Sequence, residues 1–301
     1  MKIFTIMPFL FFAIGTYAQK SYVLKQNFPI GKKYDYSIVS DQIINQKISG
    51  QVVNLTQNIG TDYTFDIRNG EGSEKDIQVI YKRIFMKSTV HGNTMSMDSD
   101  DADTTKENAF RGLKNATYNM VMLPNGTIKS ITGVDKMIID MVGRLKADSA
   151  ISAKLKSGFK QQFNAESLKQ GMESSLKVYP DNPVKVGDNW TVNTKMKLTM
   201  PIETTTKYTL KEIKDGVAFL SISGTLLSKG TFENMGNKID TDLTGTNMGD
   251  AELDIKTGLI LKSHLRMELS GNMQTMGRSI DFELQGINKV VGKEITSEIL
   301  K

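Results

Sequence analysis

The chain has 301 residues, of which 24% are charged, with a formal net charge of +5 and no cysteine. The lack of cysteine excludes disulfides, thiolate metal sites and cysteine nucleophiles. Lysine and arginine are mixed with acidic residues and form no basic stripe, so we expect no nucleic-acid partner.

The first 18 residues have the pattern of a secretory signal peptide. A short positive region, Met1-Lys2, precedes the apolar stretch 3–14 and the cleavage pattern Thr16-Tyr17-Ala18. Cleavage there would leave a mature chain that begins at Gln19, where a lipid anchor would require cysteine. We therefore expect an exported, periplasmic or extracellular protein that is not lipid-anchored and has no transmembrane segment in its mature chain.

Residues 19–132 are predicted to form a first block of antiparallel strands. Polar and apolar residues alternate there, as in Tyr34, Tyr36 and Ile38, which is typical of strands with one buried face. Turns are expected where glycine and asparagine gather, because both tolerate positive φ. The predicted turns are Gly60-Thr61-Asp62, Asn69-Gly70-Glu71-Gly72, His91-Gly92-Asn93 and Pro124-Asn125-Gly126.

Residues 133–179 are predicted to form a helical insert. Apolar residues recur there at every third or fourth position, which favours about three short amphipathic helices. Asp148 or Ser149 is the expected N-cap of the second helix, and Asn164 that of the third. Each helix has one apolar stripe, which we expect to pack against the sheet.

Residues 180–301 are predicted to form a second strand block, which we expect to pack with the first as one unit. The alternation returns, and it is clearest between residues 259 and 270. Leucines and Met267 fall on one face there, whereas the other face is charged. The residues of the charged face are Lys262, His264, Arg266 and Glu268.

The two strand blocks share a weak internal sequence similarity. Residues 30–34 resemble residues 186–190, and residues 60–63 resemble residues 216–219, both at an offset of 156 positions (186 minus 30, and 216 minus 60). We therefore predict an α+β fold that is mainly antiparallel β, with two strand-rich blocks in a curved sheet or half-barrel. A pseudo-duplication is one origin of such blocks, and the helices form a central insert.

Residues 183–190 carry the pattern Pro-Val-x-Val-Gly-Asp-x-Trp. With this pattern, the later turn Thr257-Gly258-Leu259-Ile260 and the strand, helix, strand order, the chain resembles an uncharacterised family of exported Bacteroidota proteins, a domain of unknown function. That resemblance implies no activity. Trp190, the single tryptophan, is expected to be a core anchor that begins a strand rather than a binding residue.

The overall order also looks like the half-barrels that carry lipoproteins or lipids through bacterial envelopes. In those proteins a curved sheet wraps an apolar cavity with helices as a lid, so the resemblance implies an apolar ligand.

Methionines are the candidate ligand-binding residues. Fifteen remain in the mature chain when Met1 and Met7 are subtracted from the 17 of the whole sequence. The flexible, polarisable thioether suits variable apolar ligands, although methionine also simply fills cores. The residues predicted to line a cavity are Met95, Met97, Met120, Met122, Met137 and Met141.

Catalytic and metal chemistry find little support in the sequence. His91 lies in a predicted turn and His264 on a charged strand face, so both are expected at the surface. The acidic stretch 98–103 fails the spacing of a calcium-binding EF-hand, and we expect a solvated loop there. We predict no cofactor and no metal.

Three functions remain open from the sequence. The favoured hypothesis is a non-catalytic exported envelope protein that binds an apolar or lipid-like ligand. The alternative is an envelope or extracellular protein-interaction module. A carboxylate-dependent hydrolase is the third, and it would require two carboxylates facing one cleft at about 5 to 10 Å.

Overall fold

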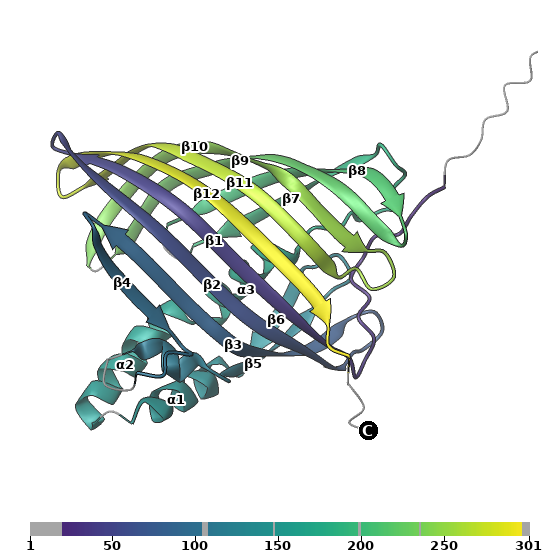
Figure 1. The fold of residues 1–301 in the computed structure, drawn as a ribbon, viewed down its shortest axis with the longest axis horizontal. Helices are drawn as coiled ribbons and strands as arrows, with labels where there is room; N and C mark the ends of the chain where they lie inside the picture. Colours follow the sequence, from purple (N-terminus) through teal and green to yellow (C-terminus); the bar gives the residue numbers. More distant parts are fainter. Residues whose placement is uncertain (1–19, 104–107, 147, 198–199, 235, 297–301) are drawn as a thin grey trace, which may run out of the picture.

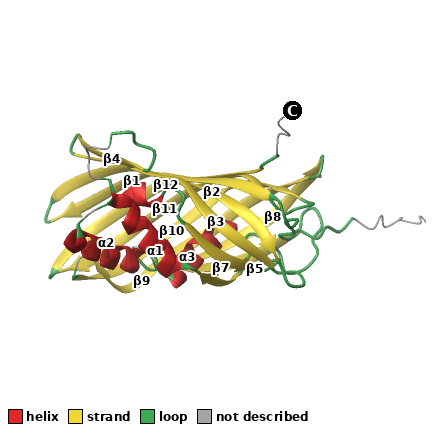
Figure 2. Cartoon of the chain, turned by 90° about the horizontal axis from the view of Figure 1, so that it is seen from below, coloured by secondary structure: helices red, strands yellow, loops and turns green. Residues whose placement is uncertain are grey.

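The computed structural model describes residues 20–103, 108–146, 148–197, 200–234 and 236–296. The signal peptide predicted for residues 1–18 lies outside these described residues. The described residues form one strongly curved, open antiparallel sheet of twelve strands, and Figure 2 shows the helices lying across its opening. The predicted fold class, mainly antiparallel β with a curved sheet and three central helices, is confirmed.

The sheet is made of long strands interrupted by one helical segment. The strands are β1 (Lys33–Ile48), β2 (Gln51–Asn69), β3 (Lys75–Val90), β4 (Asn93–Asp98), β5 (Thr117–Met122), β6 (Ile128–Thr132), β7 (Asn189–Met196), β8 (Ile202–Lys214), β9 (Val217–Asn234), β10 (Asn237–Asp254), β11 (Ile260–Thr275) and β12 (Arg278–Glu294). The helices are α1 (Val134–Leu145), α2 (Ser149–Gln162), α3 (Ala165–Leu176) and a short 3-10 helix η1 (Ala109–Leu113).

The strand order is β6-β5-β3-β2-β1-β12-β11-β10-β9-β8-β7, and β4 pairs with the hairpin end of β3. Most neighbours are consecutive in the sequence, as expected of hairpins. The pairing of β1 with β12 joins the first and last strands, in a register that runs from Tyr34–Glu294 to Ile48–Ile280. The tips of the β1–β2 and β11–β12 hairpins therefore lie at the same end of the sheet, at the upper left of Figure 1.

Helix α3 lies between the two edges of the open sheet and contacts both β6 and β7. The backbone N–H of Ile128 donates to Glu173 Oε1 at 2.8 Å, and the N–H of Lys197, just after β7, donates to Gln170 Oε1 at 2.9 Å. Edge strands otherwise expose unpaired N–H groups, so α3 both satisfies and joins the two edges. The N-cap residues Asp148 and Asn164 accept hydrogen bonds as predicted, from Ile151 N and Ser167 N.

Trp190 lies at the start of β7 as predicted, and it is partly buried against the core. Its ring stacks on Tyr208 with centroids 5.7 Å apart, and its Nε1–H donates to the carbonyl of Val178 at 3.0 Å. This hydrogen bond links the segment after α3 to the sheet and satisfies the indole N–H.

One predicted turn is wrong: Gly60 lies in the middle of β2 and not in a turn. A Cβ at this position would clash with the ring of Phe85, which packs over it from β3. Glycine is therefore required here for close packing against Phe85. Gly216, the residue that corresponds to Gly60 in the internal sequence similarity, does lie in a turn, with a φ of 79°. The predicted turns at 69–72, 91–93 and 124–126 all connect strands as expected.

Candidate functional site

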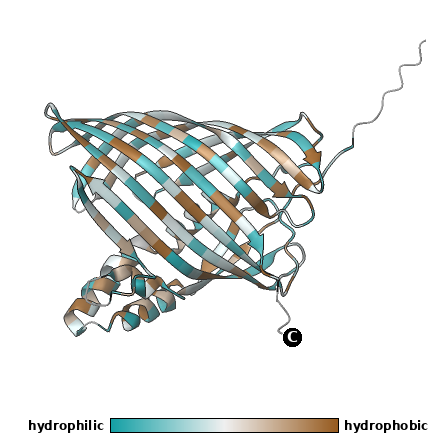
Figure 3. Ribbon diagram, viewed as in Figure 1, coloured by the Kyte–Doolittle hydropathy of each residue, from teal (hydrophilic) through white to brown (hydrophobic). Residues whose placement is uncertain are grey.

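The two faces of the sheet differ in charge. Because paired residues share a face, the register assigns every charged side chain of β1, β2, β9, β10 and β11 to the outer, convex face. On β12, Arg278 and Glu294 share the parity of the inner face, but they lie at the strand ends. The alternation of hydrophilic and hydrophobic residues along the strands can be followed in Figure 3. The concave face is therefore lined by uncharged side chains along the length of these strands.

One end of the inner face is closed. Tyr34, Tyr36, Phe65, Ile67 and Val79 are all between 0% and 1% exposed there. The same cluster includes residues of the helical insert and of the segment 20–32, which together cover this end. We call these covered residues the closed end.

The opposite end of the same face, toward the hairpin tips, is only partly covered. Inner-face apolar residues of β1, β2 and β3 are half-buried there, although they lie on the same strands and face as the closed end. We call this region the open end. Its half-buried residues on these strands are Ile44, Ile48, Val53, Leu55, Ile59, Met86 and Val90.

The other wall of the open end is a second apolar cluster on β9 to β12, which packs with Ile44 and Ile48 of β1. Its residues are buried, in contrast to the half-buried residues of β1 to β3. They are Leu226, Leu243, Leu269, Met273, Ile280, Phe282 and Leu284. The open end thus joins a packed apolar wall to a partly accessible one.

The six predicted methionines divide between the two ends. Met120, Met122, Met137 and Met141 are at most 2% exposed and belong to the core of the closed end. Met95 and Met97 are on β4 opposite Ser88 and Met86, so they share the inner face, and Met95 is 53% exposed. The structure therefore brings two of the six to the accessible surface of the open end.

A row of residues that are all polar or small except Met267 crosses the inner face between the two ends. Successive strand pairings link Ser88 to Gln57, Gln57 to Gln42, and Gln42 to Gly286. They continue through Met267, Asn247 and Gly224 to Thr206. We call these eight residues the polar row: Ser88, Gln57, Gln42, Gly286, Met267, Asn247, Gly224 and Thr206. The sequence analysis missed it because residues on different strands meet only once the register is known.

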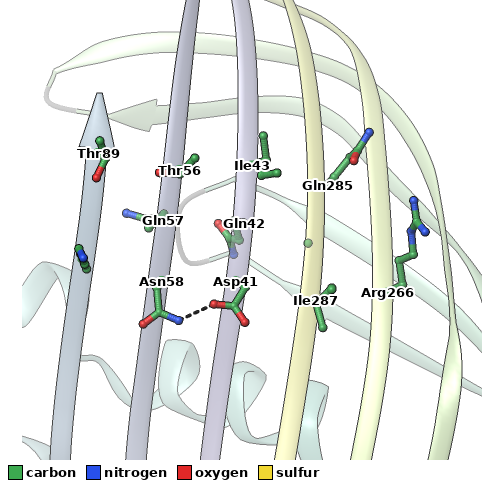
Figure 4. Close-up of a pocket in the computed structure, with 12 residues that line it drawn as sticks. Asp41, Gln42, Ile43, Thr56, Gln57, Asn58, Thr89, Arg266, Gln285 and Ile287 are labelled. Carbon is green, nitrogen blue, oxygen red and sulfur yellow. Dashed lines mark hydrogen bonds between the residues drawn. The ribbon is translucent and has the colours of Figure 1, made fainter. Parts of the chain in front are cut away.

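A groove of about 560 Å³ crosses the outer face (Figure 4). Among the described residues that line it, Asp41 is the one carboxylate, and its Oδ1 accepts a hydrogen bond from Asn58 Nδ2 at 2.5 Å. This hydrogen bond, with Lys289 nearby, lowers the pKa of Asp41 below its ordinary value. A single ionised carboxylate does not supply the pair that glycoside hydrolysis requires.

The histidines lie where the sequence predicts. His91 occupies the β3–β4 turn with φ of 48°, and His264 is exposed on the outer face of β11. In the acidic stretch, Asp98 pairs with Arg83 and Asp100 with Lys114. Among the described residues, no group of three or more histidine or carboxylate side chains lies where it could hold a metal ion.

No helix in the described part of the chain is long and apolar enough to cross a membrane.

Comparison with known proteins gives one sequence match. The model of a family of unknown function (DUF6263) matches residues 72–260, more than half of the chain. No curated protein matches the chain.

Several solved structures align with most of this chain. A lipovitellin structure concerned with lipid–protein interactions aligns with 90% of this chain and 26% of its own, at 9% identity and a TM-score of 0.48. An outer membrane channel from Pseudomonas putida F1 aligns with 89% of this chain and 97% of its own, at 8% identity and a TM-score of 0.30. The translocator domain of the autotransporter NalP from Neisseria meningitidis aligns with 88% and 90%, at 6% identity and a TM-score of 0.35.

This chain therefore spans about a quarter of the length of the lipovitellin chain. These identities and TM-scores are too low to indicate a shared function.

Proposed function

This chain belongs to a family of unknown function, DUF6263, and we propose that it is an exported, non-catalytic envelope protein that binds an apolar or lipid-like ligand at the open end. The observation that carries the proposal is the half-buried, uncharged apolar surface formed there by residues such as Ile44, Leu55 and Met86. Partly accessible apolar residues that gather on one face are typical of interaction sites. Export rests on the signal-peptide pattern of residues 1–18.

The chemistry of the inner face supports this class of ligand. An apolar molecule gains free energy in proportion to the apolar area that it buries, at about 25 cal/mol per Å². A charged molecule would find no counter-charge along the inner face of β1, β2 or β9 to β11. Met95 and Met97 add flexible side chains at the margin, which suits ligands of variable shape.

Native mass spectrometry of the protein purified from its own envelope, followed by solvent extraction, tests the proposal directly. A stoichiometric apolar molecule is the expected result. Binding of the uncharged fluorescent probe N-phenylnaphthylamine is the second readout, and it applies even if the ligand is lost during purification.

Adjacent residues of β1 offer a matched pair of variants. Ile44→Lys places a charge on the inner face, whereas Ile43→Lys places it on the outer face, where Ile43 is already 50% exposed. We expect Ile44→Lys to abolish probe binding and Ile43→Lys to retain it. Met95→Lys, at an exposed position of the same face, tests the site if Ile44→Lys fails to fold. Empty protein that also binds no probe would refute the proposal.

The outer groove favours a second candidate function, interaction with another envelope protein. Ile43 and Ile287 contribute apolar surface among polar groups in this groove, and Lys87 and Arg266 contribute positive charge. In this case Arg266→Glu should reduce recovery of a partner from envelope extract without changing probe binding. Recovery of the same amount of partner by Arg266→Glu and by the unchanged protein would contradict a role of the outer groove in binding that partner.

A further inference from the structure

The polar row separates two parts of the inner face that both carry apolar residues. On its hairpin side, the next inner-face residues are Leu55, Ile44 and Leu284, which pair in register across β2, β1 and β12. On its other side, Ile59 and Leu265 occupy the corresponding positions of β2 and β11, and the polar residues Ser40 and Asn288 occupy those of β1 and β12. Polar groups placed between two apolar zones cost free energy unless they are hydrogen-bonded.

Asn247 is the member of the row with an unmet hydrogen bond. Its side chain lies above Gly224 of the neighbouring strand and its Nδ2 donates to Thr206 Oγ1 at 3.4 Å. The residue is 4% exposed, yet its Oδ1 has no hydrogen-bond partner among the described residues. A buried carbonyl oxygen of this kind is uncommon and requires an explanation.

The two glutamines of the row use their N–H groups on neighbouring side chains. Gln57 Nε2 donates to Ser88 Oγ at 2.9 Å, and Gln42 Nε2 donates to Ser40 Oγ at 2.9 Å. Asn247 Oδ1 is therefore the buried atom of the row that the described residues leave without a partner, and an amide oxygen accepts hydrogen bonds. Gly286 and Gly224 bring no side chain into the row.

We infer that the polar row selects, among apolar ligands, those with an uncharged hydrogen-bond donor, a hydroxyl or an N–H, that reaches Asn247 Oδ1. The inference rests on the proposed binding of an apolar ligand at the open end and names the chemical group that such a ligand carries. An ionised group is disfavoured because no charged side chain of the row would pair with it. The apolar zone on the hairpin side accommodates the rest of the molecule.

Two isomers test the inference. Dodecanol donates a hydrogen bond, whereas undecyl methyl ether has the same atoms and only accepts one. Each is titrated against bound N-phenylnaphthylamine, and the measured quantity is the ratio of the two displacement constants. Comparing this ratio between proteins cancels the different solubility of the isomers in water.

Asn247→Leu is nearly isosteric and removes the acceptor. We expect the preference for the alcohol to fall about five- to tenfold, which corresponds to one hydrogen bond of ordinary net strength. Gln42→Leu, at a half-buried position, is the second variant and should lower the preference less. Gln285→Leu is the matched control because Gln285 is the exposed outer-face neighbour of Gly286.

The outcomes separate the two proposals. Probe binding with an unchanged alcohol-to-ether ratio in both Asn247→Leu and Gln42→Leu would overturn the inference and leave the proposed function standing. An equal fall in the Gln285→Leu control would also overturn it. Absence of probe binding in the unchanged protein would overturn the proposed function and the inference together.

Discussion

The closed and open ends are built from the same strands and the same face, yet they differ in burial. On β2, Ile67 is fully buried at the closed end, whereas Ile59, eight residues earlier (67 minus 59) on the same face, is half-buried. Both obey the same alternation, so local sequence does not separate them. The helices and the segment 20–32 cover one end and not the other. Sheet pattern therefore specifies which residues face inward, and the covering elements decide which become core and which remain available.

Alkaline pH should produce the largest effect, because the closed end contains a row of buried tyrosines. Burial raises the pKa of Tyr81 and Tyr118 well above the ordinary value, and it raises the pKa of Tyr63 to about 12. A raised folded-state pKa stabilises the protein fully below the unfolded value near 10, and this stabilisation is lost as pH rises through the folded value. A tyrosine whose pKa is higher by one in the folded than in the unfolded protein contributes about 1.4 kcal/mol.

We therefore expect cooperative unfolding above pH ~10, with tyrosine ionisation and loss of near-ultraviolet circular dichroism in the same transition. Ionisation of all eight tyrosines of the mature chain (nine minus Tyr17) in the folded protein, before any loss of that signal, would contradict a tightly packed closed end.

The two isoleucines of β2 give the sharpest comparison of the two ends. Ile67→Ala should lower the free energy of unfolding by about 3 to 4 kcal/mol, because it leaves a cavity in a fully packed core. Ile59→Ala should cost about 1 kcal/mol, because its side chain is only partly removed from water. Urea denaturation followed by fluorescence measures both. Equal losses would mean that the open end is packed as tightly as the closed end.

The bridge formed by α3 should have an intermediate effect. Glu173→Ala removes the acceptor of the N–H of Ile128, a fully buried residue, and should cost about 1 to 3 kcal/mol. Glu173→Gln keeps an acceptor oxygen and should cost much less. Hydrogen exchange at Ile128 identifies the cause, since this amide should lose protection in the alanine variant alone. Equal hydrogen-exchange rates of the Ile128 amide in the alanine and glutamine variants would show that the Glu173 hydrogen bond does not stabilise this edge of the sheet.

The smallest effect is expected at the attachment of β4, which holds Met95 and Met97 at the open end. Arg83 Nε donates to Asp98 Oδ1 at 3.1 Å, and this hydrogen bond lowers the pKa of Asp98. The lowered pKa stabilises the fold above the unfolded value of about 3.9, and the stabilisation is lost as pH falls through the folded value.

Asp98→Asn should therefore lower the free energy of unfolding by less than about 1 kcal/mol at neutral pH, because the side chains of Arg83 and Asp98 are both partly exposed. At a pH where Asp98 is protonated, the substitution should not change the free energy of unfolding. Thermal melts of both proteins at neutral and strongly acidic pH measure this difference. A difference that persists at acidic pH would assign it to packing rather than to charge.

Sequence patterns predicted the secondary structure well and the site poorly. Alternation located the strands, and the caps Asp148 and Asn164 located the starts of α2 and α3. Gly60 was misplaced because a mid-strand glycine that accommodates Phe85 has the same composition signal as a turn. Methionine content identified Met95 and Met97 of the open end together with four core residues, because residue type does not report coverage.

The sequence by itself determined antiparallel strands that alternate between polar and apolar residues, a central helical insert and the absence of cysteine chemistry, because these follow from local periodicity and composition. Only the tertiary structure decided that β1 pairs with β12, that α3 joins the two sheet edges, and that Gln42 and Asn247 share one row. These features depend on register and on contacts between residues far apart in the chain. A shift of register by one residue would turn each side chain to the opposite face, and the alternation of a single strand does not say which partner it meets.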